Sequence, residues 1–157
     1  MTDTELLPID VNGMAHVNLT VSSFSAALEF YDQLLPFFGL KKVMETETFV
    51  YWVGGRTGLA IQRCAPEYSR DVFVQARVGL HHLCFRARER DDIDAAARFL
   101  KEIGAKIIRG PQAGEWAPGY YYVLFEDPDG IRLEICHIPG RGLLTEGVSF
   151  DNASKDY

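Results

Sequence analysis

His16-Val-Asn-Leu-Thr-Val21, near the start of the chain, returns in its second half as His82-Leu-Cys-Phe-Arg-Ala87. In both segments alternate residues are apolar, which is typical of a strand with one buried face. Each segment is followed by apolar residues at three- and four-residue intervals, a pattern that predicts a helix packed on a sheet. Gly39 and Gly104 stand where these helices would end, and glycine suits such a cap. The chain therefore contains an internal repeat.

Three strand-like segments follow each predicted helix. They lie at about 41–45, 48–53 and 58–64 in the first half, and at 106–109, 120–126 and 131–138 in the second. Asp127-Pro-Asp-Gly130 predicts a tight turn before the last segment, because proline presets φ and glycine accepts a positive φ.

The repeat predicts one α+β domain over residues 1–157, made of two βαβββ modules at about 13–64 and 80–138. We expect their eight strands to form one curved sheet, a cup with the helices on its outside. Residues 145–157 are polar without periodicity, which indicates a flexible tail.

Composition and charge exclude several classes of function. The formal net charge of −6 argues against a nucleic-acid surface, which needs clustered lysine and arginine. No apolar run approaches the roughly 20 residues of a membrane span, and the acidic N-terminus lacks the layout of a secretion signal. Three cysteines without a C-x-x-C pair indicate free thiols in a reducing compartment. We therefore expect a cytoplasmic protein whose partner is a small molecule rather than nucleic acid or membrane.

Ligand-type side chains share the strand faces that lie opposite the apolar residues. Alignment of the first and last strands of each module places His16, Gln62, His82 and Glu134 at equivalent positions. Two imidazoles and a carboxylate on one concave surface suit a divalent ion such as Zn, Ni, Co or Fe, with positions left open for substrate. Gln62 would add a weaker, neutral fourth ligand.

The other histidines and the cysteines are assigned no ligand role. His81 has the wrong parity for the cup, and His137 lies near the end of its strand. Cys64, Cys84 and Cys136 fall two residues beyond the ligand positions, roughly 7 Å along each strand. We interpret them as small residues of the core or of the pocket lining.

Two arginines and an aromatic segment are candidates for substrate binding. Arg86 and Arg132 have the parity of the ligands, so they either hold an anionic substrate or reach solvent from the rim. Trp116, Tyr120 and Tyr122 would wall an apolar pocket or form a lid, or else pack over the sheet for stability alone.

These motifs resemble the vicinal oxygen chelate superfamily, which includes glyoxalases, bleomycin-resistance proteins and extradiol dioxygenases. The resemblance covers about residues 13–138, and its most specific part is Asp127-Pro-Asp-Gly-Ile-Arg-Leu-Glu134. It implies a bound divalent metal that chelates adjacent substrate oxygens. The ligands that it implies are His16, Gln62, His82 and Glu134.

The resemblance implies a metal-dependent lyase or isomerase that moves a proton on a small oxygenated substrate, with Glu134 as one candidate base. An Fe(II) extradiol-type dioxygenase remains an alternative, because it uses the same two-histidine, one-carboxylate set. A third possibility is a non-catalytic protein that sequesters a ligand, as bleomycin-resistance proteins do. A homodimer is expected from the family alone.

Overall fold

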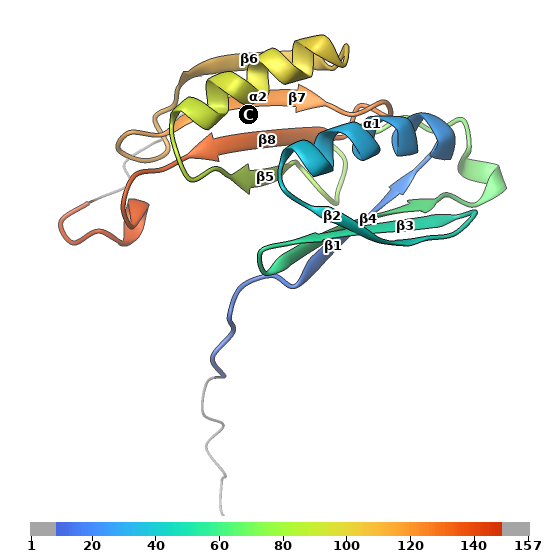
Figure 1. Cartoon of the computed structure of the whole chain (residues 1–157), viewed down its shortest axis with the longest axis horizontal. Coiled ribbons are helices and arrows are strands. Elements are labelled where there is room, and N and C mark those ends of the chain that lie inside the picture. Colours follow the sequence, from blue (N-terminus) through green and yellow to red (C-terminus); the bar gives the residue numbers. More distant parts are fainter. Residues whose placement is uncertain (1–8, 149–157) are drawn as a thin grey trace, which may run out of the picture.

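The computed structural model describes residues 9–148, which form two consecutive βαβββ modules (Figure 1). The first module comprises β1 (His16–Val21), α1 (Phe24–Phe37), β2 (Lys41–Glu45), β3 (Phe49–Gly54) and β4 (Thr57–Arg63). The second comprises β5 (Leu83–Arg86), α2 (Asp91–Glu102), β6 (Lys106–Ala113), β7 (Tyr121–Glu126) and β8 (Arg132–His137). Short 3-10 helices lie at Pro66–Tyr68 and Gly142–Leu144. The predicted α+β fold of two βαβββ modules is confirmed.

Each module forms its own four-stranded sheet, in the orders β1-β4-β3-β2 and β5-β8-β7-β6. The first strand of each module runs parallel to the last, and the remaining pairs are antiparallel. Within residues 9–148, β1 and β5 each have a single hydrogen-bonded neighbour. The eight strands therefore form two sheets within one chain, rather than the one continuous sheet that we expected.

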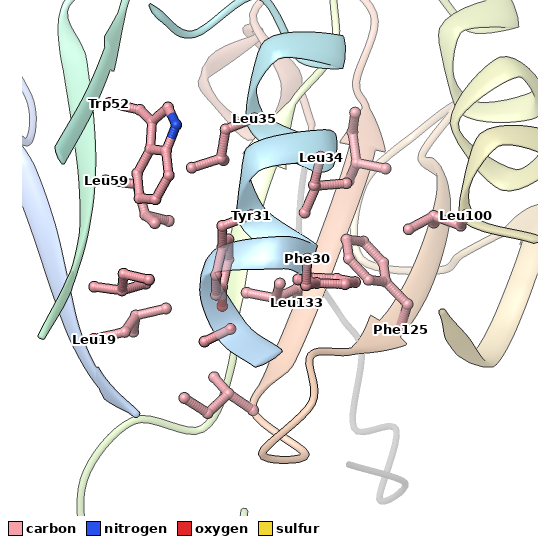
Figure 2. Close-up of a cluster of buried hydrophobic side chains, with 14 of the residues drawn as sticks. Leu19, Phe30, Tyr31, Leu34, Leu35, Trp52, Leu59, Leu100, Phe125 and Leu133 are labelled. Atoms are coloured by element: carbon pink, nitrogen blue, oxygen red, sulfur yellow. The ribbon is translucent and has the colours of Figure 1, made fainter. Parts of the chain in front are cut away.

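Helix α1 lies between the sheets of the two modules (Figure 2). Its side chains pack toward Trp52 and Leu59 of the first sheet, and toward Phe125 and Leu133 of the second. The buried residues of α1 are Phe24, Ala27, Phe30, Tyr31, Leu34 and Leu35. Each large apolar side chain among them contributes about 1.5–3 kcal/mol by leaving water, so α1 is the centre of a core shared by both modules.

Helix α2 instead covers only the second sheet. It contacts β6, β7 and β8, and its buried residues Ile93, Ala96, Ala97 and Leu100 follow a helical repeat. The predicted ends of both helices are confirmed, because Gly39 and Gly104 follow them with φ of 83° and 70°, a region that favours glycine.

The predicted Asp127–Gly130 turn also ties the modules together. The Tyr31 hydroxyl of α1 donates to Asp127 Oδ2 at 2.9 Å. The Ser22 N–H, between β1 and α1, donates to Asp129 Oδ2 at 2.7 Å, and the Ser22 hydroxyl donates to Asp129 Oδ1. We call these contacts the turn latch. Burial raises the pKa of Asp127 to about 6, although the Tyr31 hydrogen bond opposes this shift.

The predicted tail is described only in part. Of the predicted tail, residues 149–157 lie outside the described residues, and residues 145–148 form a turn in which the Val148 N–H donates to the Thr145 carbonyl. No helix within residues 9–148 combines the length and the apolar character needed to span a bilayer.

Candidate metal and substrate site

A cavity of about 150 Å³ opens on the second module. The predicted residues that line it are His82, Trp116, Tyr120, Tyr122, Arg132 and Glu134. Most of the predicted site is thus brought together by β7, β8 and the segments that precede β5 and β7.

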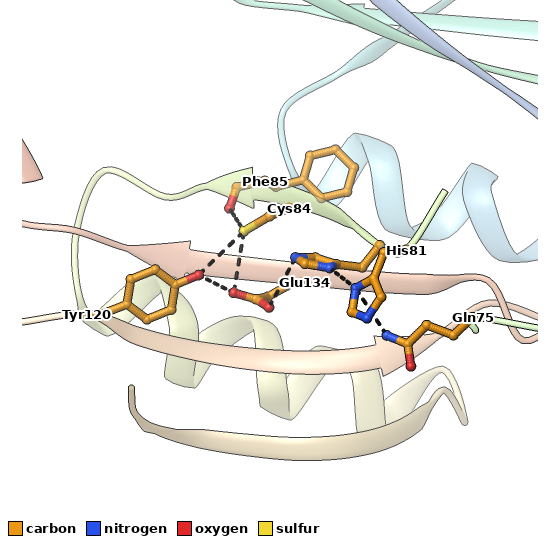
Figure 3. Close-up of polar contacts among 7 residues, drawn as sticks. Gln75, His81, Cys84, Phe85, Tyr120 and Glu134 are labelled. Carbon is orange, nitrogen blue, oxygen red and sulfur yellow. Dashed lines mark hydrogen bonds and ion pairs between the residues drawn. The ribbon is translucent and has the colours of Figure 1, made fainter. Parts of the chain in front are cut away.

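Glu134 is the centre of the cavity's polar network. Its side chain is only 8% exposed, and its Oε2 lies 3.9 Å from His82 Nε2. The Tyr120 hydroxyl donates to Glu134 Oε1, and Cys84 Sγ lies 3.5 Å from the same oxygen (Figure 3). Burial raises the pKa of Tyr120, so this hydroxyl keeps its proton and remains a donor.

A chain of hydrogen bonds sets the tautomer of His82. The Gln75 amide nitrogen, which can only donate, lies 3.3 Å from His81 Nδ1, so that ring nitrogen is an acceptor (Figure 3). His82 Nδ1 lies 2.7 Å from the same atom and must therefore carry the proton. His82 Nε2 is left with a free lone pair beside Glu134, the form in which histidine ligates metals.

Electrostatics favour the same neutral form of His82. Burial in the cavity lowers the pKa of His82, and neighbouring His81 lowers it further, while Glu134 opposes both effects. The imidazole is consequently unprotonated at neutral pH, as metal binding requires.

The cysteines lie closer to this centre than the sequence predicted. In the parallel β5–β8 pair Cys84 stands directly opposite Glu134, and Cys136 follows two residues later on the same face. We predicted that the cysteines lie two residues, or roughly 7 Å, beyond the ligand positions. Cys84 does follow His82 by two residues, but it lies directly beside Glu134, so the prediction was wrong with respect to that ligand. The hydrogen bond between the two thiols lowers the pKa of Cys136 to about 7 and raises that of Cys84.

The first module holds His16 away from this cavity. His16 is exposed on β1, opposite Gly58, and its ring meets Tyr51 edge-on with centroids 6.4 Å apart. It does not line the cavity that contains His82 and Glu134. One chain therefore presents two of the three principal predicted ligands at one place and the third on the other sheet (Figure 1).

Gln62 does not occupy the position equivalent to Glu134. Gln62 pairs with Thr20, two steps beyond His16 on the same face, while Ala60 pairs with Asn18. Since Cys84 pairs with Glu134 in the second module, the repeat makes Ala60 the counterpart of Glu134. The predicted equivalence of Gln62 and Glu134 is therefore wrong, because Gln62 lies two residues beyond the counterpart of Glu134. The sequence of a single strand does not reveal its offset from a parallel neighbour.

The three predicted aromatic residues form one cluster. Trp116 packs edge-on against Tyr120 and Tyr122, with ring centroids 5.3 and 5.0 Å away. The indole Nε1 of Trp116 is buried and has no hydrogen-bond partner among the described residues. These side chains form an apolar wall, a surface suited to an organic ligand.

The two predicted arginines differ in their placement. Arg132 lines the cavity, where its Nε donates to Glu126 Oε1 at 2.9 Å. Arg86 lies in the groove between the modules, and its guanidinium donates to the carbonyls of Ile138 and Gly140 at 3.0 and 3.2 Å. Arg86 is thus bound to the chain that follows β8 rather than facing the cavity.

Five cavity residues were missed by the sequence analysis: the polar Gln75, His81 and Arg109, and the apolar Ile108 and Leu124. His81 was set aside on parity, but β5 begins only at Leu83, so strand alternation does not apply to it. Arg109 sits at a bulge of β6, which shifts the alternation of that strand. Gln75 belongs to the segment between the modules, where no periodic pattern identifies it.

Known proteins share this architecture. The sequence profile of the Glyoxalase/Bleomycin resistance protein/Dioxygenase superfamily matches residues 13–135. The metallothiol transferase FosB of Shouchella clausii is 31% identical over 125 residues, which are 80% of each chain. YqjT of Bacillus subtilis, an uncharacterised protein, is 30% identical over 125 residues, covering 78% of this chain and 96% of YqjT.

Solved structures agree with the profile. The crystal structure of a glyoxalase-type protein from Bacillus halodurans is 30% identical and superposes with a TM-score of 0.73 over 81% of this chain and 96% of the other. A glyoxylase/bleomycin resistance protein/dioxygenase domain from Frankia, 23% identical, has the same fold, with a TM-score of 0.67 over 82% of this chain and 98% of its own. The chain therefore belongs to the glyoxalase/bleomycin resistance protein/dioxygenase superfamily, the vicinal oxygen chelate proteins.

Proposed function

We propose that this protein is a metal-dependent enzyme of the glyoxalase type, a lyase or isomerase acting on a small oxygenated substrate. The observation that carries the proposal is the neutral Nε2 of His82 beside the buried carboxylate of Glu134, inside a cavity with an aromatic wall. The metallothiol transferase FosB, at 31% identity, supports the metal requirement by its name alone.

The donor set of the cavity fits a divalent transition metal. His82 supplies a lone pair held by its second nitrogen, and Glu134 supplies a carboxylate oriented by Tyr120. An ion held there would act as a Lewis acid on a substrate oxygen. We leave the ion as zinc, nickel, cobalt or iron.

The chain's own residues have distinct tasks in this proposal. Tyr120 holds Glu134 Oε1, which leaves Oε2 to bind the ion or, once released from it, to accept a proton from the substrate. Trp116 and Tyr122 exclude water and pack against the apolar part of the substrate. Arg132 and Arg109 attract an anionic group at the mouth of the cavity.

We further propose a homodimer in which His16 of one chain completes the cavity of the other. Two observations support it: His16 is exposed on a sheet that does not share the cavity, and β1 and β5 are edge strands within residues 9–148. A two-fold axis that brings β1 of one copy beside β5 of the other would form two such sites at once. We propose a reducing, cytoplasmic location, which suits the free thiols.

The aromatic wall also favours a second candidate, a ligand-sequestering protein without chemistry. Trp116, Tyr120 and Tyr122 offer stacking surfaces that need no metal. This candidate predicts that an aromatic ligand still binds after complete chelation of metal, whereas the enzyme loses both metal and turnover. The iron-dependent dioxygenase differs again, because its activity requires Fe(II) and oxygen.

The decisive experiment measures metal content by elemental mass spectrometry, on protein as isolated and after reconstitution with Ni²⁺, which favours imidazole ligands. We expect about one equivalent per chain, lost in His16→Ala and in His82→Ala. His137→Ala is the matched control, because His137 belongs to β8 but does not line the cavity. Absence of bound nickel in the wild type would overturn the enzyme and leave the sequestering protein.

A further inference from the structure

We propose that Cys84, Glu134 and Cys136 of a single chain form a second binding mode, a site for a thiophilic divalent ion such as Cd²⁺ or Zn²⁺. It goes beyond the proposed function, because this site requires neither His16 nor His82 and is complete within a single chain. It shares only Glu134 with the histidine site.

The ligand atoms already lie at coordinating separations. The two sulfur atoms and a Glu134 carboxylate oxygen all lie within 4.8 Å of one another, and Cys84 Sγ is 3.5 Å from Glu134 Oε1. Zinc bonds of about 2.3 Å to sulfur and 2.0–2.2 Å to oxygen place tetrahedral ligands roughly 3.5–3.8 Å apart. Small side-chain rotations therefore suffice to close the three groups around one ion.

Strand register makes this arrangement rigid. Cys84 on β5 is paired with Glu134 on β8, and Cys136 is paired with Arg86, so the three ligands project from one face of two parallel strands. Glu134 and Cys136 are 6% and 4% exposed, whereas Cys84 is exposed. Two ligands are thus held by the surrounding packing, and the third gives an ion access from solvent.

The chemistry of the set selects soft ions. Two thiolates and one carboxylate favour zinc and cadmium over magnesium, calcium or manganese. Binding displaces the two thiol protons to solvent, so that both sulfur atoms ligate as thiolates. Tyr120, whose oxygen lies 3.9 Å from Cys84 Sγ and donates to Glu134, lies beside the open fourth position.

Because both modes use Glu134, occupation of one excludes the other. A thiophilic ion at the cysteines withdraws the carboxylate that the histidine site requires. The inference therefore predicts that Cd²⁺ competes with Ni²⁺ although Glu134 is the only protein ligand that the two ions share.

The test is a titration of the full-length protein with Cd²⁺, followed by the ultraviolet charge-transfer absorption of cadmium–thiolate bonds. We expect one equivalent to produce the band, about half of it to remain in Cys84→Ser or Cys136→Ser, and none in the double variant. Cys64→Ser is the matched control and should keep the full band, because Cys64 belongs to the other module. No band in the wild type, or a band that survives the double variant, overturns the proposal.

A second measurement uses the wild type alone and does not depend on the folding of variants. Cd²⁺ should protect the exposed Cys84 from alkylation, mapped by mass spectrometry, while Cys64 reacts as before. Equal alkylation of Cys84 with and without Cd²⁺ contradicts the site. His16→Ala should lose nickel but keep the cadmium band, so failure of the histidine site and failure of the cysteine site give different results.

Discussion

The two modules share one order of strands but differ on the face that carries the site. At equivalent positions the second module has Cys84 and Glu134, and the first has Asn18 and Ala60. The second module has a cavity beneath an aromatic wall, whereas the first presents His16 on the exposed face of β1.

A glycine shows the same contrast between the modules two residues earlier on the last strand. Gly58 is the counterpart of Arg132, and a β-carbon at Gly58 would lie 2.2 Å from the Tyr51 hydroxyl. The Tyr51 ring thus covers the place where the second module presents an arginine. The repeat preserves what the shared core demands, namely apolar alternation and helix caps, while side chains on the open face are free to diverge.

The largest effect should come from the helix that the modules share. Leu34→Ala removes a fully buried side chain of α1, and we expect a loss of about 2–5 kcal/mol in the free energy of unfolding. Denaturant unfolding should remain a single transition, because both sheets pack on α1. Val43→Ala, on exposed β2, should change stability by less than about 0.5 kcal/mol. Two separate transitions would contradict the shared core.

Substitutions at Glu134 and Gln62 sharpen the comparison at the site itself. We expect Glu134→Gln to weaken nickel binding by about 100-fold or more, because the anionic ligand is lost. Gln62→Ala should change it by less than about threefold, since strand register places Gln62 beyond the ligand position. Calorimetric titration measures both, and equal losses would restore Gln62 as a ligand.

The turn latch should make stability depend on pH. The folded pKa of Asp127, about 6, exceeds its value of 3.8 without burial, so folding favours the protonated carboxyl. Stability from this group is present below about pH 4 and is lost as pH rises to about 6, by about 3 kcal/mol. Asp127→Asn should remove this decline from urea-unfolding curves. If the free energy of unfolding changes equally between pH 4 and pH 6 in the wild type and in Asp127→Asn, the assignment to Asp127 is refuted.

Mixing two inactive variants tests whether the unlike modules meet across a dimer. His16→Ala and Glu134→Gln each disable a different side of the proposed site. If chains exchange freely, half of the dimers are mixed and each has one intact site, so nickel binding should return to about a quarter of the sites. A site formed within one chain would show no recovery on mixing.

Apolar periodicity predicted both helices and all eight strands, because nearly every element buries a face in the common core; β2, which is exposed at each residue, is the exception. Proline and glycine predicted the tight turn, and the aromatic segment around Trp116 predicted one wall of the cavity. The register between parallel strands could not be predicted, since the partners are far apart in the sequence and neither strand alone fixes the offset. The error at Gln62 comes from the register of β1 against β4, and the error at Cys84 from the register of β5 against β8.

The contacts of side chains at the ends of strands were equally hard to predict. Arg86 has the predicted parity, yet carbonyl groups after β8 bind its guanidinium. His81 precedes its strand and turns toward His82, a contact that alternation does not describe. Such positions depend on tertiary neighbours rather than on local periodicity.

The turn latch has a consequence for the connectivity of the chain. Ser22 and Tyr31 bind Asp129 and Asp127 from the opposite half, so the halves adhere through buried hydrogen bonds and α1, independently of the segment that links them. A nick around residues 69–72, before Phe73 whose N–H donates to the Asp129 carbonyl, would leave both interfaces in place. The protein should therefore tolerate being encoded as two polypeptides that assemble into one fold.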